Sequence, residues 1–201
     1  MSDNQLTALE RYQEYYSIPD ALPINVQPLS AQQELPSWDD FEQEVPDVFR
    51  LASELHSADA STTSTLRHLG DAAELIVQVL HQQNMKLNLL LGYVLRNEDS
   101  AELRQQTVEL GGGGVRYIDN DCELTLGQNV QLKVFLNSAL HNVAAAIYAY
   151  AEVAAIEKTA QGQLITLAFS RILDSDRELI VRASLHAQSR LLKKRAEERD
   201  K

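Results

Sequence analysis

The chain has 201 residues, 44% of them hydrophobic and 23% charged, which is the composition of an ordinary globular protein with one buried core. Its formal net charge of −11 disfavours binding to nucleic acid and to anionic lipid. The one cysteine, Cys122, excludes an internal disulfide, and no apolar stretch has the roughly 18 residues that span a membrane, so we expect a cytoplasmic protein without a membrane span.

The first strand is predicted where Leu22, Ile24 and Val26 alternate with polar or proline residues. The segment that follows is acidic, rich in glutamine and interrupted by prolines. Pro46 suits the first turn of a helix because its missing N–H would have no partner there. We interpret residues 31–60 as an acidic linker and a short helix, lying mainly against the next helix rather than in the β-domain.

A long helix is predicted within residues 61–100, from about Thr63 to Asp99. At a rise of 1.5 Å per residue it is about 55 Å long, and a helix of that length needs a partner along it. Its heptad seam is apolar except at Gln83 and Asn97. The seam residues predicted to form an oligomer interface are Leu66, Leu69, Ala73, Ile76, Leu80, Gln83, Leu87, Leu90 and Val94.

The width of this seam predicts how many helices associate. The flanking positions include Val77, Val79, Leu91 and Tyr93, a stripe too wide for a two-stranded coiled coil, whose flanks are normally charged. We therefore expect a homo-oligomer, a tetramer with a trimer as the alternative, in which copies of Gln83 bond one another and fix the register. The competing interpretation is a helix that packs on its own domain, with Gln83 at an exposed edge.

Strands are predicted again after Ser100, in QQTVEL, VRYI, ELTL, QNVQLKVFLN and QLITLAFSRI. Residues 142–162 are ambiguous, because their alanines favour a helix whereas Ile147, Ala149, Ala151 and Val153 alternate with other residues as in a strand. The chain closes with a predicted helix over residues 175–201. Ser175 and Glu178 have the spacing of a capping box at its start.

Four consecutive glycines, Gly111 to Gly114, indicate unusual backbone dihedrals or close approach of backbone segments. They do not form a Walker loop, because Val115 and Arg116 stand where Lys and Ser or Thr are required. The dinucleotide fingerprint fails as well, since Arg116 occupies the place of its last glycine. A sharp bend and a phosphate-binding nest of backbone amides are the two remaining interpretations.

No constellation of residues predicts catalysis or metal binding. The histidines include no i,i+4 pair, and the acidic residues around Cys122 disfavour a reactive thiolate. Asp119 to Glu123 begins like a calcium loop but lacks the glycine and the glutamate that such a loop requires, so we interpret it as a hairpin turn. We expect no catalytic residues, no metal, no cofactor and no enzymatic activity.

Taken in chain order, several segments resemble a PilZ domain, the small six-stranded β-barrel best known as a bacterial receptor for cyclic di-GMP. They are RYQEY, ELGGGGV, LGQNVQLKVFL, GQLITLAFSRI and DSDRELIVRASLHAQ. The resemblance covers residues 8–30 and 104–190. It implies an α+β fold, namely a six-stranded PilZ-like β-barrel with an inserted long coiled-coil helix and a C-terminal helix.

The ligand motifs of that family are only partly present. Its R-x-x-x-R segment matches Arg11, but Tyr15 replaces the second arginine, whose planar charged fork grips phosphate and guanine. Its D/N-x-S-x-x-G motif aligns with residues 109–114 and keeps only Gly114. Because each lost charge-assisted contact costs about 1.5–3 kcal/mol, cyclic di-GMP binding is expected to be weak or absent.

The resemblance therefore implies a non-enzymatic, atypical PilZ-domain protein in bacterial cyclic di-GMP-related signalling, such as the regulation of motility, pili or virulence. We expect it to act as an oligomeric interaction module that binds itself and an unidentified protein partner. The alternative is a genuine cyclic di-GMP receptor that binds through Arg11 and the turn from Gly111 to Gly114, with Arg116 supplying the missing charge.

Overall fold

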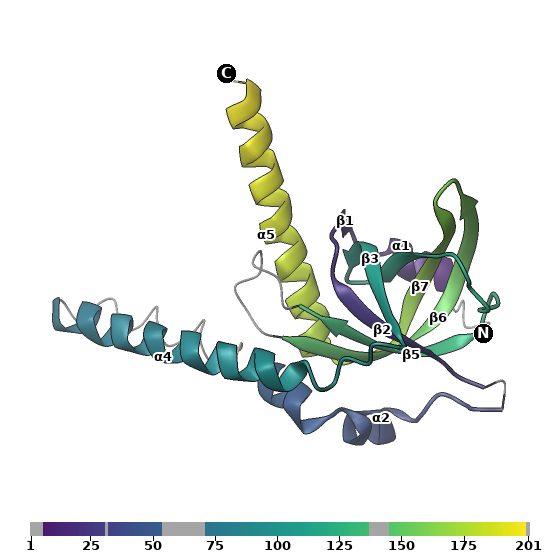
Figure 1. Cartoon of the computed structure of the whole chain (residues 1–201), viewed down its shortest axis with the longest axis horizontal. Helices are drawn as coiled ribbons and strands as arrows, with labels where there is room; N and C mark the ends of the chain where they lie inside the picture. Colours follow the sequence, from purple (N-terminus) through teal and green to yellow (C-terminus); the bar gives the residue numbers. More distant parts are fainter. Residues whose placement is uncertain (1–5, 31, 54–70, 137–144, 200–201) are drawn as a thin grey trace, which may run out of the picture.

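Figure 1 shows the computed structural model of the chain, which describes residues 6–30, 32–53, 71–136 and 145–199. The strands are β1 (Ser17–Pro19), β2 (Pro23–Pro28), β3 (Arg104–Gly111), β4 (Gly114–Asp119), β5 (Asn129–Phe135), β6 (Ala146–Thr159) and β7 (Gly162–Ile172). The helices are α1 (Ala8–Gln13), α2 (Trp38–Glu44), α4 (Asp71–Leu95) and α5 (Asp174–Arg199), and residues 47–53 are helical as well.

The strands form one seven-stranded sheet whose pairings are all antiparallel. β4 pairs with both β7 and β3, so the order β3-β2-β5-β6-β7-β4 closes into a six-stranded barrel. The short β1 pairs with the end of β3 beyond β2. The predicted six-stranded barrel with an inserted long helix and a C-terminal helix is therefore confirmed.

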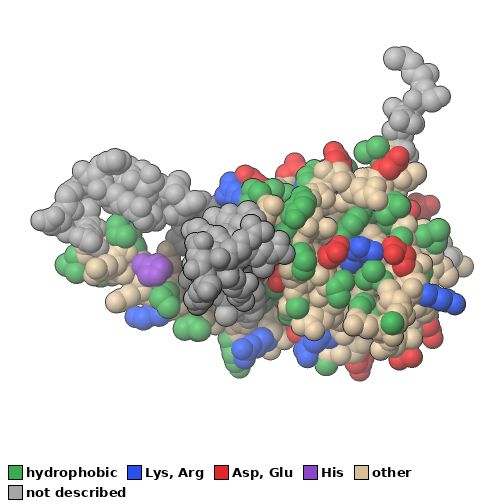
Figure 2. Space-filling model, turned by 90° about the horizontal axis from the view of Figure 1, so that it is seen from above, with side chains coloured by type: hydrophobic (Ala, Val, Ile, Leu, Met, Phe, Trp, Pro, Cys, Tyr) green, Lys and Arg blue, Asp and Glu red, His purple; other side chains and the backbone are tan. Residues whose placement is uncertain are grey.

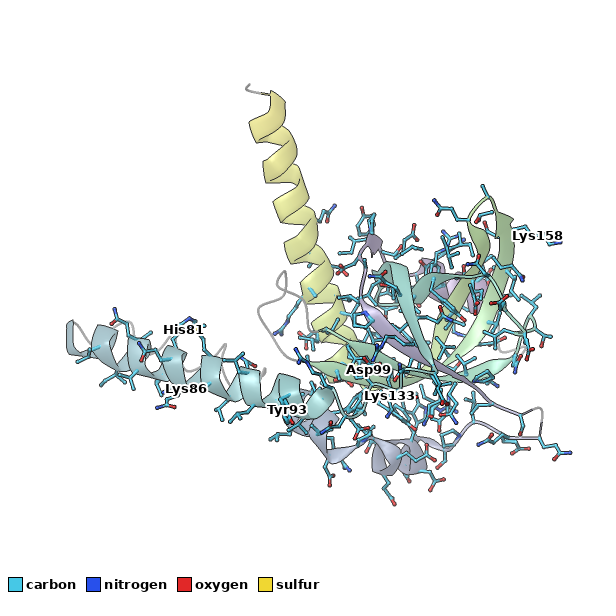
Figure 3. All side chains as sticks on the ribbon, in the orientation of Figure 1. His81, Lys86, Tyr93, Asp99, Lys133 and Lys158 are labelled. Carbon is cyan, nitrogen blue, oxygen red and sulfur yellow. The ribbon has the colours of Figure 1, made fainter. Side chains whose placement is uncertain are left out.

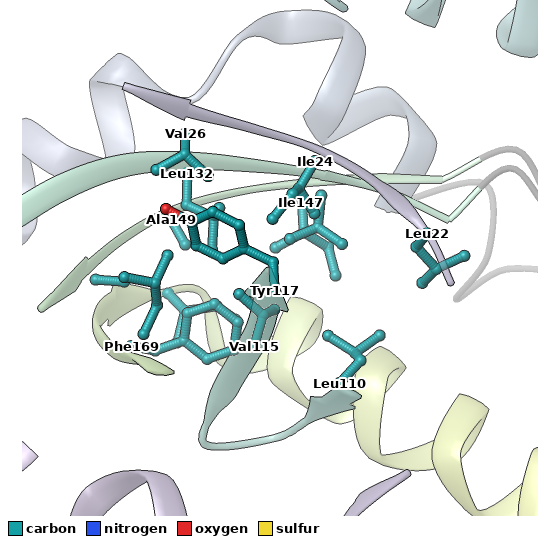
Figure 4. Packing of buried hydrophobic residues seen from close by; sticks show 14 of the residues in the cluster. Leu22, Ile24, Val26, Leu110, Val115, Tyr117, Leu132, Ile147, Ala149 and Phe169 are labelled. Carbon is teal, nitrogen blue, oxygen red and sulfur yellow. The ribbon is translucent and has the colours of Figure 1, made fainter. Parts of the chain in front are cut away.

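The inward faces of the strands meet in one apolar core (Figure 4). The alternation seen at Leu22, Ile24 and Val26 is retained, and these side chains meet Tyr117 and Ile147 inside the barrel. The other members of the core that Figure 4 labels are Leu110, Val115, Leu132, Ala149 and Phe169. Since a closed barrel has no free edge, this core and the pairing of β3 with β4 together hold the fold.

The hairpin predicted at residues 119–123 is wrong. β4 pairs with β3 and β7, whereas β5 pairs with β2 and β6, so the chain between them crosses from one part of the barrel to another. Residues 123–126, predicted as a strand, lie in this crossing segment. Its start is an Asx turn, in which the Asp121 N–H donates to Asp119 Oδ1 at 3.0 Å.

The ambiguous segment is resolved as strand β6 because both of its faces are buried. Ile147 and Ala149 point into the barrel core, while Tyr148 and Tyr150 belong to a second core on the outside. Two buried faces give a nearly continuous apolar run, which periodicity alone does not distinguish from a helix. The alanine content reflects tight packing in a barrel rather than helical propensity.

The second core joins the insertion to the outer face of the barrel. Phe41 of α2 and Phe49 of the helical residues 47–53 are almost fully buried against Tyr148 and Tyr150, as is Leu95 at the end of α4. Residues 31–60 were expected to lie mainly against the long helix, and the described residues 38–52 of this segment also cover β5 and β6. The aromatic rings responsible lie far apart in sequence.

Helix α4 projects away from the barrel, and among the described residues its C-terminal end packs into the second core (Figure 1). Leu91 and Leu95 are 5% and 2% exposed, whereas the seam residues Ile76 and Leu80 are 52% and 43% exposed. The seam residues Leu87, Leu90 and Val94 and the polar Gln83 are exposed as well. Ala73 lies within α4, and Leu66 and Leu69 lie outside the described residues.

Figure 3 shows His81, Lys86 and Tyr93 along this projecting stretch. No helix within the described ranges is long and apolar enough to cross a membrane.

Helix α5 begins at Asp174, so the capping box predicted at Ser175 is wrong. The N–H groups of Asp176 and Arg177 donate to the Leu173 carbonyl, which places the helix start one residue before Ser175. A capping box does open α1, where Thr7 and Glu10 bond reciprocally. Bonds from the Thr7 backbone N–H and hydroxyl lower the pKa of Glu10. Both helices lie next to the glycine hairpin.

Candidate functional site

The glycine run is a two-residue hairpin between β3 and β4, in which Gly111 pairs with Gly114. Side chains would not fit here. A Cβ on Gly112 would lie 2.6 Å from Tyr15 Cδ1 and 2.9 Å from Val181 Cγ2, and one on Gly113 would lie 2.7 Å from the Arg11 carbonyl oxygen. The predicted sharp bend is therefore present, and its glycines are needed because α1 and α5 press directly on it.

Arg177 of α5 occupies the space beside this hairpin. Its guanidinium carbon lies 5.1 Å from the centre of the Tyr15 ring, a cation–π contact, and its Nη1 donates to the Gly112 carbonyl oxygen. Tyr15 thus stands where the family motif has its second arginine, and it packs under an arginine from another element. We call Arg177, Tyr15 and Gly112 the α5 clasp.

The two predicted ligand arginines come together on the adjoining outer face of the barrel, but each is held by carboxylates. Arg11 Nη2 lies 2.6 Å from Glu152 Oε2 on β6. Arg116 Nη2 lies 3.0 Å from Glu157 Oε1 on β6, and its Nη1 lies 3.5 Å from Glu109 Oε2. Glu152 pairs across strands with Ala168, which pairs with Gly114, so the Arg11 ion pair lies beside the glycine hairpin.

Tyr12 links this ion-pair network to α1. Its hydroxyl donates to Glu109 Oε2 at 3.2 Å, so that one carboxylate contacts both Tyr12 and Arg116. Burial raises the pKa of Tyr12 to about 12, with a further contribution from the negative charge of Glu109. The phenol therefore stays protonated and acts as a donor across the whole physiological pH range.

The local charges cancel. Three guanidiniums, from Arg11, Arg116 and Arg177, stand near three carboxylates, from Glu109, Glu152 and Glu157. On the face of the barrel that Figure 2 shows, acidic and basic side chains are interspersed rather than gathered into one basic patch. A doubly phosphorylated ligand would have to displace carboxylates from both ligand arginines. The same network leaves Arg11 Nε and Arg116 Nε buried without a partner among the described residues.

Sequence reasoning brought Arg11, Gly114 and Arg116 to one site, and the structure places them together. It did not find Arg177 of the α5 clasp or the acidic partners Glu152 and Glu157. Arg177 lies in α5 and both glutamates lie in β6, far along the chain from Arg11. The available signal was Tyr15 at the position of the second arginine of the R-x-x-x-R segment. Among the described residues, no group of three or more His, Cys, Asp or Glu side chains could hold a metal.

Comparison with family models and with curated protein sequences finds no match for this chain. Solved structures do match. A Xanthomonas campestris pathogenic protein, described as a tetrameric PilZ domain self-assembled through an unusual helical bundle, is 15% identical, with a TM-score of 0.51 over 92% of this chain and 97% of its own. Bacillus subtilis MotI/DgrA, an inhibitor of motility, is 12% identical, with a TM-score of 0.47 over 88% of this chain and 51% of its own.

A third matching structure is Escherichia coli YcgR in complex with cyclic di-GMP. It is 14% identical, with a TM-score of 0.38 over 49% of this chain and 42% of its own. This chain therefore spans about half or less of MotI/DgrA and YcgR, and nearly all of the Xanthomonas protein. The match to the Xanthomonas protein shows that the chain has a PilZ-like domain fold.

Proposed function

We propose that this PilZ-like chain is a non-enzymatic signalling module of cyclic di-GMP-related pathways that acts by binding proteins, first of all other copies of itself. The observation that carries this proposal is the state of the family's ligand motif. Both arginines suited to a phosphate are in ion pairs with carboxylates, and the position of a further arginine is filled by Tyr15 in the α5 clasp.

The energetic argument concerns competition for the guanidiniums. An incoming phosphate has to break the bonds of Arg11 to Glu152 and of Arg116 to Glu157, and it then leaves two carboxylates beside an anion. Like charges at close range oppose binding, and the lost serine and arginine contacts add about 1.5–3 kcal/mol each. The site therefore supports a structural role better than a receptor role.

The alternative function, a genuine cyclic di-GMP receptor, is favoured by one observation. Arg11, Arg116 and the glycine hairpin lie on the same part of the barrel face, as a receptor would require. Calorimetric titration with cyclic di-GMP separates the two functions. We expect a dissociation constant weaker than about 100 μM, the scale implied by losing several charge-assisted contacts. A constant near one micromolar would establish the receptor function instead.

The proposed mode of action is assembly through α4. Its seam at Ile76, Leu80, Leu87, Leu90 and Val94 is exposed in the single chain, and an exposed apolar stripe of this length on a projecting helix needs a cover. A second copy supplies the same seam. The helical bundle through which the Xanthomonas protein self-assembles as a tetramer supports this proposal, and a tetramer in particular. The further protein partner, and a cytoplasmic location, belong to the same proposal.

A further inference from the structure

A cavity of about 330 Å³ lies where the insertion meets the outer face of the barrel, away from the glycine hairpin. The barrel contributes Gln27 of β2, Gln131 and Lys133 of β5 and Tyr148 of β6, which neighbouring strand pairings place side by side. The insertion contributes Glu44 of α2 and Glu98, just after α4. We call this space the insertion pocket.

Two sets of polar contacts tie the insertion to the barrel around the pocket. Glu44 Oε2 accepts a 2.6 Å hydrogen bond from the Tyr150 hydroxyl, which lies 3.4 Å from the Tyr148 hydroxyl. Lys133 Nζ lies 2.9 Å from Glu98 Oε2 and 5.7 Å from the centre of the Phe49 ring. Figure 3 shows Lys133 next to Asp99, at the end of the connection that leaves α4.

These contacts leave several acceptors of the pocket unused. Gln131 donates its Nε2 to the Tyr148 hydroxyl, but its carbonyl oxygen has no partner among the described residues. The same holds for the second carboxylate oxygens of Glu44 and Glu98 within the described ranges. Gln27 adds a carboxamide with both kinds of group. The pocket therefore offers at least three oxygen acceptors that no described donor satisfies.

The charges that line the pocket also favour a ligand that donates hydrogen bonds. Glu44 and Glu98 outweigh Lys133, so the lining is acidic by one unit, in a protein whose formal net charge is −11. An anionic ligand would meet two carboxylates, whereas a cation that donates several hydrogen bonds would satisfy the unused oxygens. Planar guanidinium groups bind carboxylate and carboxamide oxygens in this way, and ammonium groups do so with less geometric selectivity.

We propose that the insertion pocket binds a guanidinium or primary ammonium group, carried either by a small amine or by an arginine or lysine side chain of a protein partner. Contacts to Glu44 on the insertion and to Gln131 on the barrel would bridge the two parts of the fold. Occupancy therefore tightens the docking of the insertion, and with it the attachment of α4. The proposal rests on the pocket alone and is independent of self-assembly and of cyclic di-GMP binding.

The test is calorimetric titration of the full chain with agmatine, which represents a free small molecule, and with N-acetyl-argininamide, which represents a protein side chain. Propylurea is the neutral control of similar shape, and glutarate is the anionic control. We expect binding of at least one guanidinium compound and none of either control. Binding of agmatine alone identifies a free amine as the ligand, and binding of N-acetyl-argininamide identifies a side chain as sufficient.

Variants locate the site. Glu44→Gln keeps the acceptor for Tyr150 but removes the charge, and it should weaken binding by about tenfold or more. Glu42→Gln, on the exposed part of the same helix, should leave binding unchanged. Lys133→Met removes the competing cation and should strengthen binding. Circular dichroism should confirm that all three variants fold. The proposal is overturned if neither guanidinium compound binds at millimolar concentration, or if propylurea binds as tightly as they do. It is also overturned if Glu42→Gln weakens binding as much as Glu44→Gln, or if Lys133→Met abolishes binding.

Discussion

The guanidinium of Arg177 lies over the ring of Tyr15, 5.1 Å from its centre, and bonds the Gly112 carbonyl of the glycine hairpin. This relationship joins the C-terminal helix to the segment after α1 and to the β3–β4 turn. Because these contacts connect three elements that are far apart in sequence, we expect the α5 clasp to stabilise the fold.

Replacing Arg177 with alanine should destabilise the protein by about 1–3 kcal/mol, because the variant loses a cation–π contact and a charge-assisted hydrogen bond. The stability of Arg177→Lys should lie between those of the natural chain and Arg177→Ala, since lysine keeps the charge but not the planar group. Arg182→Ala, which removes an exposed ion pair with Glu178 on the same helix, is the matched control and should change stability by less than about 0.5 kcal/mol. Urea unfolding measures all three. Equal effects at positions 177 and 182 would show that the clasp contributes nothing specific.

The ion pairs at the barrel face predict a gain of function. Glu152→Gln together with Glu157→Gln removes the carboxylate partner of Arg11 and one of the two carboxylate partners of Arg116, and affinity for cyclic di-GMP should rise by about tenfold. Stability should change little, since partly exposed ion pairs contribute about 0–1 kcal/mol each. Glu14→Gln is the control, because it removes one negative charge in the same way at an exposed site at the end of α1. No gain over that control in calorimetric titration would mean that the carboxylates are not what limits binding.

The burial of Asp176 predicts that the stability of the fold depends on pH. Asp176 is 2% exposed, and burial raises its pKa from 3.8 to about 6 despite a 2.7 Å hydrogen bond from the Ser53 hydroxyl. The folded state thus holds this proton more tightly than the unfolded chain. The contribution of Asp176 to the free energy of unfolding therefore falls as pH rises from about 4 to about 6 and stays low above that.

Asp176→Asn removes this cost while keeping an acceptor for Ser53. The variant should be more stable than the natural chain at pH 7.5, by at most about 3 kcal/mol for a shift of two pKa units, and equal to it near pH 3.5. The exposed Asp174→Asn, in the same turn of α5, should show no such pH-dependent difference. Thermal unfolding across this pH range is the measurement. A constant difference between Asp176→Asn and the natural chain at all pH values would contradict the assignment.

The predictable parts of the fold are those whose residues repeat with a regular local period. Alternation at Leu22, Ile24 and Val26 identified β2, and the heptads identified α4. The second core was missed because it depends on contacts between Phe41 or Phe49 and the outward face of β6, and no local pattern gives such pairings. The order of the strands had the same limit, since the hairpin predicted after Asp119 is a crossing connection instead.

The candidate site shows the same division. Arg11 and the glycine hairpin were identified from motif spacing within short segments. The partners that decide their chemistry, Glu152 and Arg177, come from β6 and α5 and depend on strand register and helix docking. A motif therefore predicted that Arg11 lies beside the glycine hairpin, while the carboxylates that neutralise the arginines became visible only in three dimensions.

The seam of α4 can be tested by substitution. Leu80 and Leu87 are 43% and 45% exposed, so Asp at both positions costs the single chain little but places buried carboxylates in every helix of an assembled bundle. The double variant should be a folded monomer by circular dichroism and sedimentation. Leu75→Asp with Leu89→Asp changes the same residue type at two more exposed positions off the seam, 66% and 75% exposed, and this control should still assemble. Loss of assembly in both variants would mean that general hydrophobicity, and not the seam, holds the oligomer.

Self-assembly through α4 is the central claim, and the mass of the natural chain in solution tests it most directly. Light scattering at tens of micromolar should return a mass about four times the 22.5 kDa of one chain, because the exposed seam of each helix is covered by the others. A mass near 22.5 kDa under these conditions would contradict the account, and the apolar face of α4 would then have to serve a different partner.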